Sequence, residues 1–132
     1  MEDTQQPVSI VVIDDNAISL EFVAEALASS GLRILTSTIP EEGLAMVNEH
    51  HPTIVLTDVI MPYISGFEVL RLVKQVDSDI DVVLMSADDL PSTGANSAPL
   101  AAGFLRKPIP ITQLRECVAR LMEKHSANNH RP

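Results

Sequence analysis

Three aspartates could bring chemistry to this chain, because each comes directly after a short apolar run. Asp14 and Asp15 follow Ile-Val-Val-Ile, and Asp58 follows Ile-Val-Leu-Thr. Burial disfavours the charged form of a carboxylate, so acids at the ends of buried strands need a partner or a function. In a parallel α/β sheet the carboxyl ends of the strands lie along one edge, where such sheets carry their ligands. The three carboxylates could therefore converge there on one divalent cation.

The adjacent acid pair also has an ordinary structural explanation. An aspartate or asparagine just before a helix is most often an N-cap, which alone could explain Asp15 or Asn16. A third acid at the end of another strand changes the balance, because Mg²⁺ favours oxygen ligands and usually takes one or two direct carboxylates together with water. The three acids together favour a metal site.

Two further polar residues end later apolar runs. Lys107 should reach the same edge, where the acids would stabilise its ammonium group and where it could contact a transferred phosphoryl group. Ser86 would add a hydroxyl there. Taken singly, a lysine before proline is more often a solvated surface residue, and a serine at a strand end is usually a cap or turn residue. Their shared position at strand ends suits one anionic ligand.

The elements that must position these residues follow from the hydrophobic pattern. Apolar runs alternate with segments of helical period, as in repeated βα units around a parallel sheet. The pattern predicts strands over about 9–13, 33–36, 53–57, 81–85 and 104–106. It predicts helices over about 17–29, from Pro40 onward, over 67–75 and over 111–124, with Gly31 ending the first. A three-layer α/β sandwich is the economical solution, and the pattern alone leaves the strand order open.

Helical spacing also predicts which side chains face the core. They are Ile18, Phe22, Val23, Ala26 and Leu27 in the first helix, Leu44 and Val47 in the second, and Leu114, Cys117, Val118 and Leu121 in the last. Residues 88–103 are different, since Pro91, Gly94 and Pro99 oppose a helix interior. We expect a short, late or missing fourth helix there.

The composition of the 132 residues fits one domain, expected over residues 8–124, with 1–7 and 125–132 as flexible termini or a linker. A formal net charge of −9 argues against direct binding of nucleic acid, which needs clustered lysine and arginine. No apolar stretch approaches the roughly 20 residues that span a membrane. The first residues lack the features of a signal peptide and Cys117 is the single cysteine, so we expect a cytoplasmic setting.

Taken together, these residues resemble a response regulator receiver domain, the phosphoacceptor module of two-component signalling. The similarity covers about residues 8–123. It implies a flavodoxin-like fold, with strand order 2-1-3-4-5 and the site at the carboxyl edge. The motifs that carry it are Asp14-Asp15, Asp58 followed by Met61-Pro62 and Gly66, Ser86-Ala87, and Phe104 three positions before Lys107-Pro108, whose peptide bond is expected to be cis.

The resemblance implies an acceptor and a metal. Asp58 would take a phosphoryl group from the phosphohistidine of a sensor histidine kinase or a histidine phosphotransfer protein. The expected cofactor is Mg²⁺, for which Mn²⁺ could substitute. Its ligands would be Asp14, Asp15, Asp58 and the backbone carbonyl of Ile60.

The resemblance also implies a phosphoryl cradle and a switch. Lys107, Ser86 and the backbone N–H groups of Ile60 and Ala87 would bind the phosphoryl oxygens. Ser86 would move toward the phosphoryl group and Phe104 would turn inward behind it. A plain core aromatic is the alternative explanation of Phe104, whose inward state would rest on packing because it lacks a hydroxyl.

The implied function is a signalling switch that catalyses only its own phosphorylation and dephosphorylation. Its output would pass to a downstream protein or an attached output domain, with a phosphorylation-dependent dimer as an option and no direct contact with nucleic acid or membrane. A Mg²⁺-dependent aspartyl-phosphate phosphatase is disfavoured, because those enzymes carry an Asp-x-Asp motif whereas the pair here is adjacent. An unphosphorylated interaction module is the other alternative. The histidines, expected at the solvated surface, are His50, His51, His125 and His130.

Overall fold

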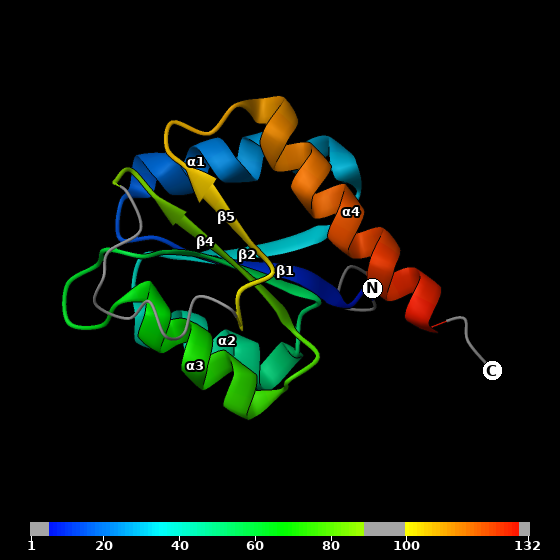
Figure 1. The fold of residues 1–132 in the computed structure, drawn as a ribbon, viewed down its shortest axis with the longest axis horizontal. Coiled ribbons are helices and arrows are strands. Elements are labelled where there is room, and N and C mark those ends of the chain that lie inside the picture. Colours follow the sequence, from blue (N-terminus) through cyan, green and yellow to red (C-terminus); the bar gives the residue numbers. More distant parts are fainter. Residues whose placement is uncertain (1–5, 89–99, 130–132) are drawn as a thin grey trace.

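The computed structural model describes residues 6–88 and 100–129, in which strands and helices alternate (Figure 1). The strands are β1 (Val8–Ile13), β2 (Arg33–Ser37), β3 (Ile54–Asp58), β4 (Asp81–Ser86) and β5 (Gly103–Arg106). The helices are α1 (Ala17–Ala26), the 3-10 turn η2 (Ala28–Ser30), α2 (Pro40–His50), α3 (Gly66–Val76) and α4 (Ile111–Asn129). All five predicted strands are confirmed, each to within one residue at either end.

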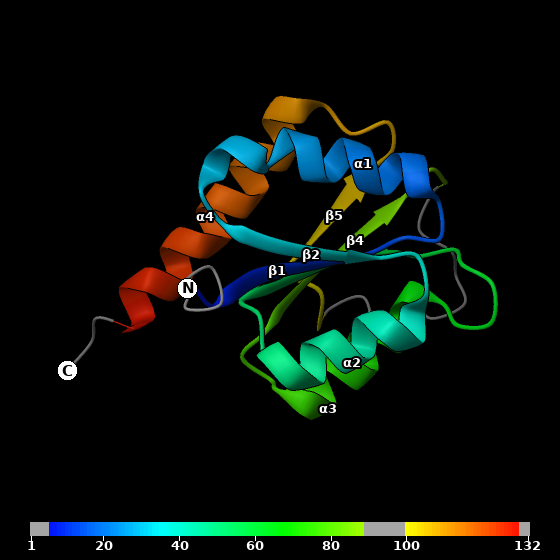
Figure 2. The ribbon, with the colours of Figure 1, turned by 180° about the vertical axis from the view of Figure 1, so that it is seen from behind.

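The five strands form one parallel sheet in the order β2-β1-β3-β4-β5, which confirms the expected flavodoxin-like order. Helices α1 and α4 cover one face, and α2 and α3 cover the other, as the two opposite views show (Figures 1 and 2). In register, Ile13 pairs with Ser37 on one side and with Thr57 on the other. The carboxyl ends of these three strands therefore lie side by side.

The core consists of two apolar clusters, one on each face of the sheet. Side chains alternate along a strand, so Ile10 and Val12 pack with α1 and α4, while Val11 and Ile13 pack with α2 and α3. Continuous apolar runs are required because both faces of the sheet are covered. The predicted core residues of the later helices are buried or packed against the clusters, namely Leu44, Val47, Leu114, Cys117, Val118 and Leu121.

The predicted core face of α1 was wrong for two residues. Ile18 is 76% exposed and Phe22 is 39% exposed, whereas Leu20 is buried with Val23. Ile18 and Phe22 each lie two positions from Leu20, and two positions correspond to about 200° around a helix. They therefore face the side of α1 away from the core. The continuous helix predicted to Ser29 also gives way to η2 after Ala26, and Gly31, at φ 79°, ends it as expected.

Helix α4 continues to Asn129, five residues beyond the predicted end at Lys124. Two side chains fasten this extension to the amino end of β4, since Lys124 Nζ and His125 Nε2 both lie 2.8 Å from Asp81 Oδ2. The sequence 125–129 also contains neither proline nor glycine, so nothing in it ends a helix. The predicted end of this helix at about Lys124 was therefore wrong, and a flexible terminus or linker over 125–132, of which 130–132 lie outside the described residues, stays a prediction.

The histidines were not all at the solvated surface as expected. His125 is partly buried against Asp81, and His50 is also partly buried. His51 is exposed, and its Nδ1 lies 2.9 Å from Asp77 Oδ2. His130 lies outside the described residues. The three described histidines all lie away from the acid cluster in the sequence, and each has an acidic neighbour in space.

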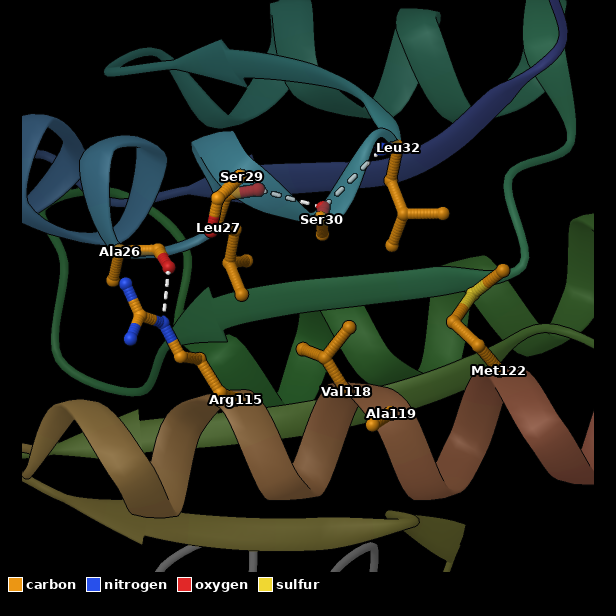
Figure 3. A pocket seen from close by; sticks show the side chains of 9 residues that line it. All are labelled: Ala26, Leu27, Ser29, Ser30, Leu32, Arg115, Val118, Ala119 and Met122. Carbon is orange, nitrogen blue, oxygen red and sulfur yellow. Dashed lines mark hydrogen bonds between the residues drawn. The ribbon is translucent and has the colours of Figure 1, made fainter.

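Helices α1 and α4 are joined at the carboxyl end of α1, beside a hollow of about 340 Å³ (Figure 3). Arg115 Nε donates a hydrogen bond of 2.7 Å to the carbonyl oxygen of Ala26, which caps one of the last carbonyls of α1. Figure 3 shows the Leu32 side chain of the η2–β2 turn and Val118 and Met122 of α4 around the same hollow. This junction holds the two helices on one face of the sheet.

Two expectations can be compared only with the described residues. Most of the segment predicted to be poorly helical, residues 89–99, lies outside the described residues, so the short or missing fourth helix stays a prediction. Among the residues that the structure describes, no helix is long and apolar enough to cross a membrane.

Candidate functional site

The three aspartates meet at the carboxyl edge of the sheet. Asp14 follows β1 and Asp58 ends the neighbouring β3, so the pairing of Ile13 with Thr57 places the two acids next to each other. Asp15 joins them, and one carboxylate oxygen from each residue lies within 4.8 Å of the others. Asp14 and Asp58 are buried, while Asp15 is exposed. The cluster therefore opens to solvent on the side of Asp15.

A lysine from the far end of the sequence neutralises part of this charge. Lys107 Nζ lies 2.7 Å from Asp14 Oδ2 and 3.6 Å from Asp58 Oδ2. It also contacts Ser19 Oγ at 3.4 Å. The backbone N–H of Lys107 donates to the carbonyl oxygen of Ser86, and the Lys107–Pro108 peptide bond is cis as expected. One ammonium group thus lies close to two of the three clustered carboxylates.

The electrostatics of Asp58 show that the cluster still carries excess negative charge. Burial is the largest influence and raises the pKa of Asp58 above its ordinary value of 3.8, and the charge of Asp14 raises it further. Lys107 and a hydrogen bond from the N–H of Val59 act in the opposite direction without cancelling the rise. A cation bound beside Asp58 would remove this repulsion.

These donors fit a hard divalent cation. The cluster offers carboxylate oxygens, no described histidine or cysteine joins it, and its opening at Asp15 leaves room for water ligands. Mg²⁺ prefers this combination of one or two carboxylates with water, whereas zinc sites normally use nitrogen and sulfur. The residues therefore fit the expected magnesium or manganese ion.

The other predicted site residues lie on neighbouring elements. Ser86 ends β4 and is buried, and its Oγ accepts a hydrogen bond of 3.2 Å from the N–H of Asp88. Ala87 is exposed and lines a groove with Lys107. Ile60 is 53% exposed on the loop after β3. Phe104, on the edge strand β5, is 38% exposed, so it is not in an inward, fully packed position.

The loop after β3 is fixed by close backbone packing. Val59 N–H donates to Met85 O at 2.8 Å, and Gly66 N–H donates to Val59 O at 2.7 Å. A Cβ atom built on Gly66 would lie 2.3 Å from the carbonyl oxygen of Asp58 and 2.7 Å from Val59 Cα. Only glycine allows α3 to begin this close to the backbone that carries Asp58.

We therefore expect Gly66→Ala to lower the free energy of unfolding by roughly 1–3 kcal/mol, because backbone must move to admit the methyl group. Gly103→Ala is the matched control, since a Cβ there has no neighbour nearer than 3.8 Å. Thermal unfolding followed by circular dichroism compares the two variants. Equal stability of Gly66→Ala and Gly103→Ala would contradict the close approach.

Sequence reasoning missed Ser19 and a groove beside Lys107. The groove is lined by Ile18, Phe22 and Val23 of α1 and by Pro108 and Ile109 after β5. Its volume is about 500 Å³. An available signal was that Ser19 lies in the first turn of α1, shortly after Asp14 and Asp15 in the sequence.

Comparison with known proteins agrees with this geometry. The family model described as the response regulator receiver domain matches residues 10–119. The chain belongs to this family. Its members act as receiver domains of two-component response regulators, and the acid cluster fits their phosphoacceptor site.

Individual receiver proteins show the same relationship. An uncharacterized response regulatory protein of Vibrio cholerae is 32% identical over 126 residues, covering 94% of this chain and 52% of that protein. The probable transcriptional regulatory protein TcrX of Mycobacterium tuberculosis is 30% identical over 112 residues, covering 83% of this chain and 47% of that protein. The chain thus spans about half the length of these curated relatives.

Solved structures agree on the fold. The receiver domain protein from Clostridium thermocellum superposes with a TM-score of 0.82 at 27% identity, covering 91% of this chain and 98% of that one. The superposition therefore extends over nearly all of the solved chain.

Proposed function

We propose that this receiver domain takes a phosphoryl group from a protein phosphohistidine onto Asp58. The observation that carries the proposal is the meeting of Asp14, Asp15, Asp58 and Lys107 at one edge of the sheet. This edge is where a carboxylate nucleophile, oxygen ligands for a cation and a positive group for a phosphoryl anion are all within reach of one another.

In the proposed transfer, an Oδ atom of Asp58 attacks the phosphorus atom of phosphohistidine. An O–P bond forms, the P–N bond breaks, and the imidazole nitrogen leaves with the electron pair and takes a proton. A carboxylate is a poor nucleophile toward an anion unless positive charge surrounds the reacting atoms. Lys107 supplies such charge 3.6 Å from Asp58 and would bind a phosphoryl oxygen.

The proposed metal ligands are Asp14, Asp15, Asp58 and the backbone carbonyl of Ile60. Mg²⁺, when bound, neutralises the negative charge of the acceptor and of the incoming phosphoryl group. Lys107 lies closer to Asp14 than to Asp58, so it holds the Asp14 carboxylate while leaving Asp58 the less neutralised of the two. Asp58 is therefore the carboxylate with the greater need for a cation and the better nucleophile.

Ser86 and Phe104 are the proposed switch pair. The Ser86 hydroxyl now accepts a hydrogen bond from the N–H of Asp88, and turning it toward a phosphoryl oxygen would break that bond. Ala87 and Ile60 would offer backbone N–H groups to the same oxygens. Phe104, being partly exposed on β5, has apolar area still to bury if it turns inward.

The groove of Ile18, Phe22, Pro108 and Ile109 is the proposed docking surface for the phosphohistidine protein. It adjoins Lys107, so a protein seated in it would hold its histidine near the reaction centre. Ile18 is 76% exposed and Phe22 is 39% exposed on α1, and burial by a partner would account for this exposed apolar surface. A sensor histidine kinase or a histidine phosphotransfer protein is the corresponding partner.

The proposal also covers how the phosphorylated domain passes on its signal. Curated relatives are about twice as long as this chain, and two of them are named as probable transcriptional regulators. We infer that phosphorylation acts on an attached output domain or a downstream protein, with a phosphorylation-dependent dimer as one means, and that the domain works in the cytoplasm without itself binding nucleic acid. In keeping with a switch, the site would act on its own aspartate and not turn over free substrates.

Removing the cation tests the proposal. Incubation with radiolabelled acetyl phosphate and Mg²⁺ should label the chain, and excess EDTA should abolish the labelling, because the acid cluster then repels the incoming phosphoryl anion. Readdition of Mg²⁺ or Mn²⁺ should restore it. Labelling that proceeds at the same rate in EDTA would show that the three acids do not act through a metal.

A further inference from the structure

Tyr63 stands out in the loop between Asp58 and α3. Its side chain is fully exposed, at 100% relative accessibility. Its φ is 74°, and the N–H of Ile64 donates a 2.8 Å hydrogen bond to the carbonyl oxygen of Pro62. A hydrogen bond from residue i+2 to residue i around a central positive φ defines the rare, strained form of the γ-turn.

This conformation is unfavourable for tyrosine. Side chains with a Cβ clash with their own backbone at positive φ, and glycine avoids that clash while asparagine tolerates it. The surrounding loop keeps the conformation in place, because Val59 and Gly66 fasten both of its ends by backbone hydrogen bonds. The aromatic ring buries no surface in return, so packing within the described part of the chain gives no reason for a tyrosine here.

The position of the ring suggests what it contacts. Tyr63 is five residues after Asp58, and Ile60 on the same loop is 53% exposed. The loop projects beyond the carboxyl edge of the sheet in both views (Figures 1 and 2). The Asp58 side chain is only 12% exposed. A protein that delivers a phosphohistidine to it must therefore contact the loop that projects beyond the carboxyl edge of the sheet. A small phosphodonor can reach Asp58 without contacting this loop.

We propose that Tyr63 is a specificity-determining contact for the phosphohistidine protein, and that the strained turn holds its ring outward for that contact. This inference rests on the proposed function of Asp58. The partner would carry an apolar pocket beside its phosphohistidine, in which the ring is buried during transfer. Aromatic side chains are the usual anchors of such interfaces, because they bury a large area at low entropic cost.

Two variants distinguish the effect of losing the aromatic ring from an effect on the backbone conformation. Tyr63→Gly and Tyr63→Asn both suit the left-handed conformation, so each should have a melting temperature equal to or above that of the wild type. Each should reduce the second-order rate of phosphotransfer by about tenfold, which is typical of the loss of an aromatic anchor. The donor is the autophosphorylated histidine kinase that labels the wild-type chain fastest in a panel. Tyr63→Phe should keep the rate within about threefold, because the ring remains.

Acetyl phosphate provides the internal control. Tyr63→Gly and Tyr63→Asn should accept phosphoryl groups from acetyl phosphate at the wild-type rate, since this small donor reaches Asp58 without contacting the loop that carries Tyr63. Val76→Ala is the matched surface control, because Val76 is also exposed but lies at the far end of α3. Wild-type rates from the kinase in Tyr63→Gly and Tyr63→Asn, or an equal loss with acetyl phosphate, would overturn the proposal. Failure of the wild type to accept from either donor would instead refute the role of Asp58.

Discussion

Asp58→Asn should abolish labelling by acetyl phosphate or by a kinase and, at the same time, make the protein more stable at pH 7. The loss of labelling follows because an amide oxygen is not a nucleophile toward phosphorus. The gain in stability follows because burial and the charge of Asp14 raise the pKa of Asp58, which means that its charged form is costly in the folded chain. The opposite signs exclude misfolding as the cause of lost labelling.

The stability gain should depend on pH in a defined direction. The folded chain holds the Asp58 proton more tightly than the unfolded chain, so the cost of the charge is full above the folded-state pKa and disappears as pH falls toward and below 3.8. The difference in melting temperature between Asp58→Asn and the wild type should therefore be largest near pH 7 and shrink toward pH 4. These measurements are made without Mg²⁺, which would relieve the same repulsion in the wild type.

Asp79→Asn is the matched control for this experiment, because Asp79 is exposed in the turn before β4. It should keep full labelling and show no such gain in stability. If Asp58→Asn were instead less stable than the wild type at pH 7, the claim that the charged form of Asp58 destabilises the folded chain would be contradicted.

Lys107→Ala should have opposite effects on phosphotransfer and on metal binding. The phosphotransfer rate should fall by about 10²–10³-fold, as when one preorganised charge is removed from a transition state. The affinity for Mg²⁺ should rise by about threefold to tenfold, because Lys107 lies 2.7 Å from Asp14 and its positive charge repels a cation at the same acids. Phosphotransfer kinetics and isothermal titration with Mg²⁺ measure the two effects.

Lys124→Ala removes an ion pair of nearly the same length, Lys124 Nζ to Asp81 Oδ2 at 2.8 Å, from the amino end of β4. It should leave both the phosphotransfer rate and the affinity for Mg²⁺ unchanged. A parallel loss of phosphotransfer in Lys107→Ala and Lys124→Ala would show that the effect is one of general stability. Weaker binding of Mg²⁺ by Lys107→Ala would refute the proposed competition for Asp14.

The sequence was sufficient to place the acid cluster because strand ends are a strong constraint. Once Asp14 and Asp58 are assigned to the ends of adjacent parallel strands, register alone brings them together. The same reasoning carried Ser86 and Lys107 to this edge. Strand order came from the resemblance to a known family, since hydrophobic pattern does not distinguish among the orders of a parallel sheet.

The sequence was less informative where tertiary contacts compete with local pattern. Ile18 and Phe22 fit a helical apolar stripe as well as Leu20 does, and only the packing of α1 on the sheet shows which stripe is buried. The extension of α4 is fastened by contacts of Lys124 and His125 with Asp81, which is far from both in the sequence. The strained turn at Tyr63 has no sequence signal, because tyrosine is a residue that turns of this kind disfavour.

The chemical position of the phosphoryl group tests the central claim most directly. After reaction with acetyl phosphate and Mg²⁺, borodeuteride reduction converts an aspartyl phosphate to deuterated homoserine. Trypsin then releases the peptide between Arg33 and Arg71, in which Asp58 is the only aspartate, while Asp14 and Asp15 fall in the preceding peptide. Mass spectrometry should find deuterium at residue 58 alone. Deuterium in the preceding peptide, or a phosphoryl group on histidine or serine with residue 58 unmodified, would contradict the account.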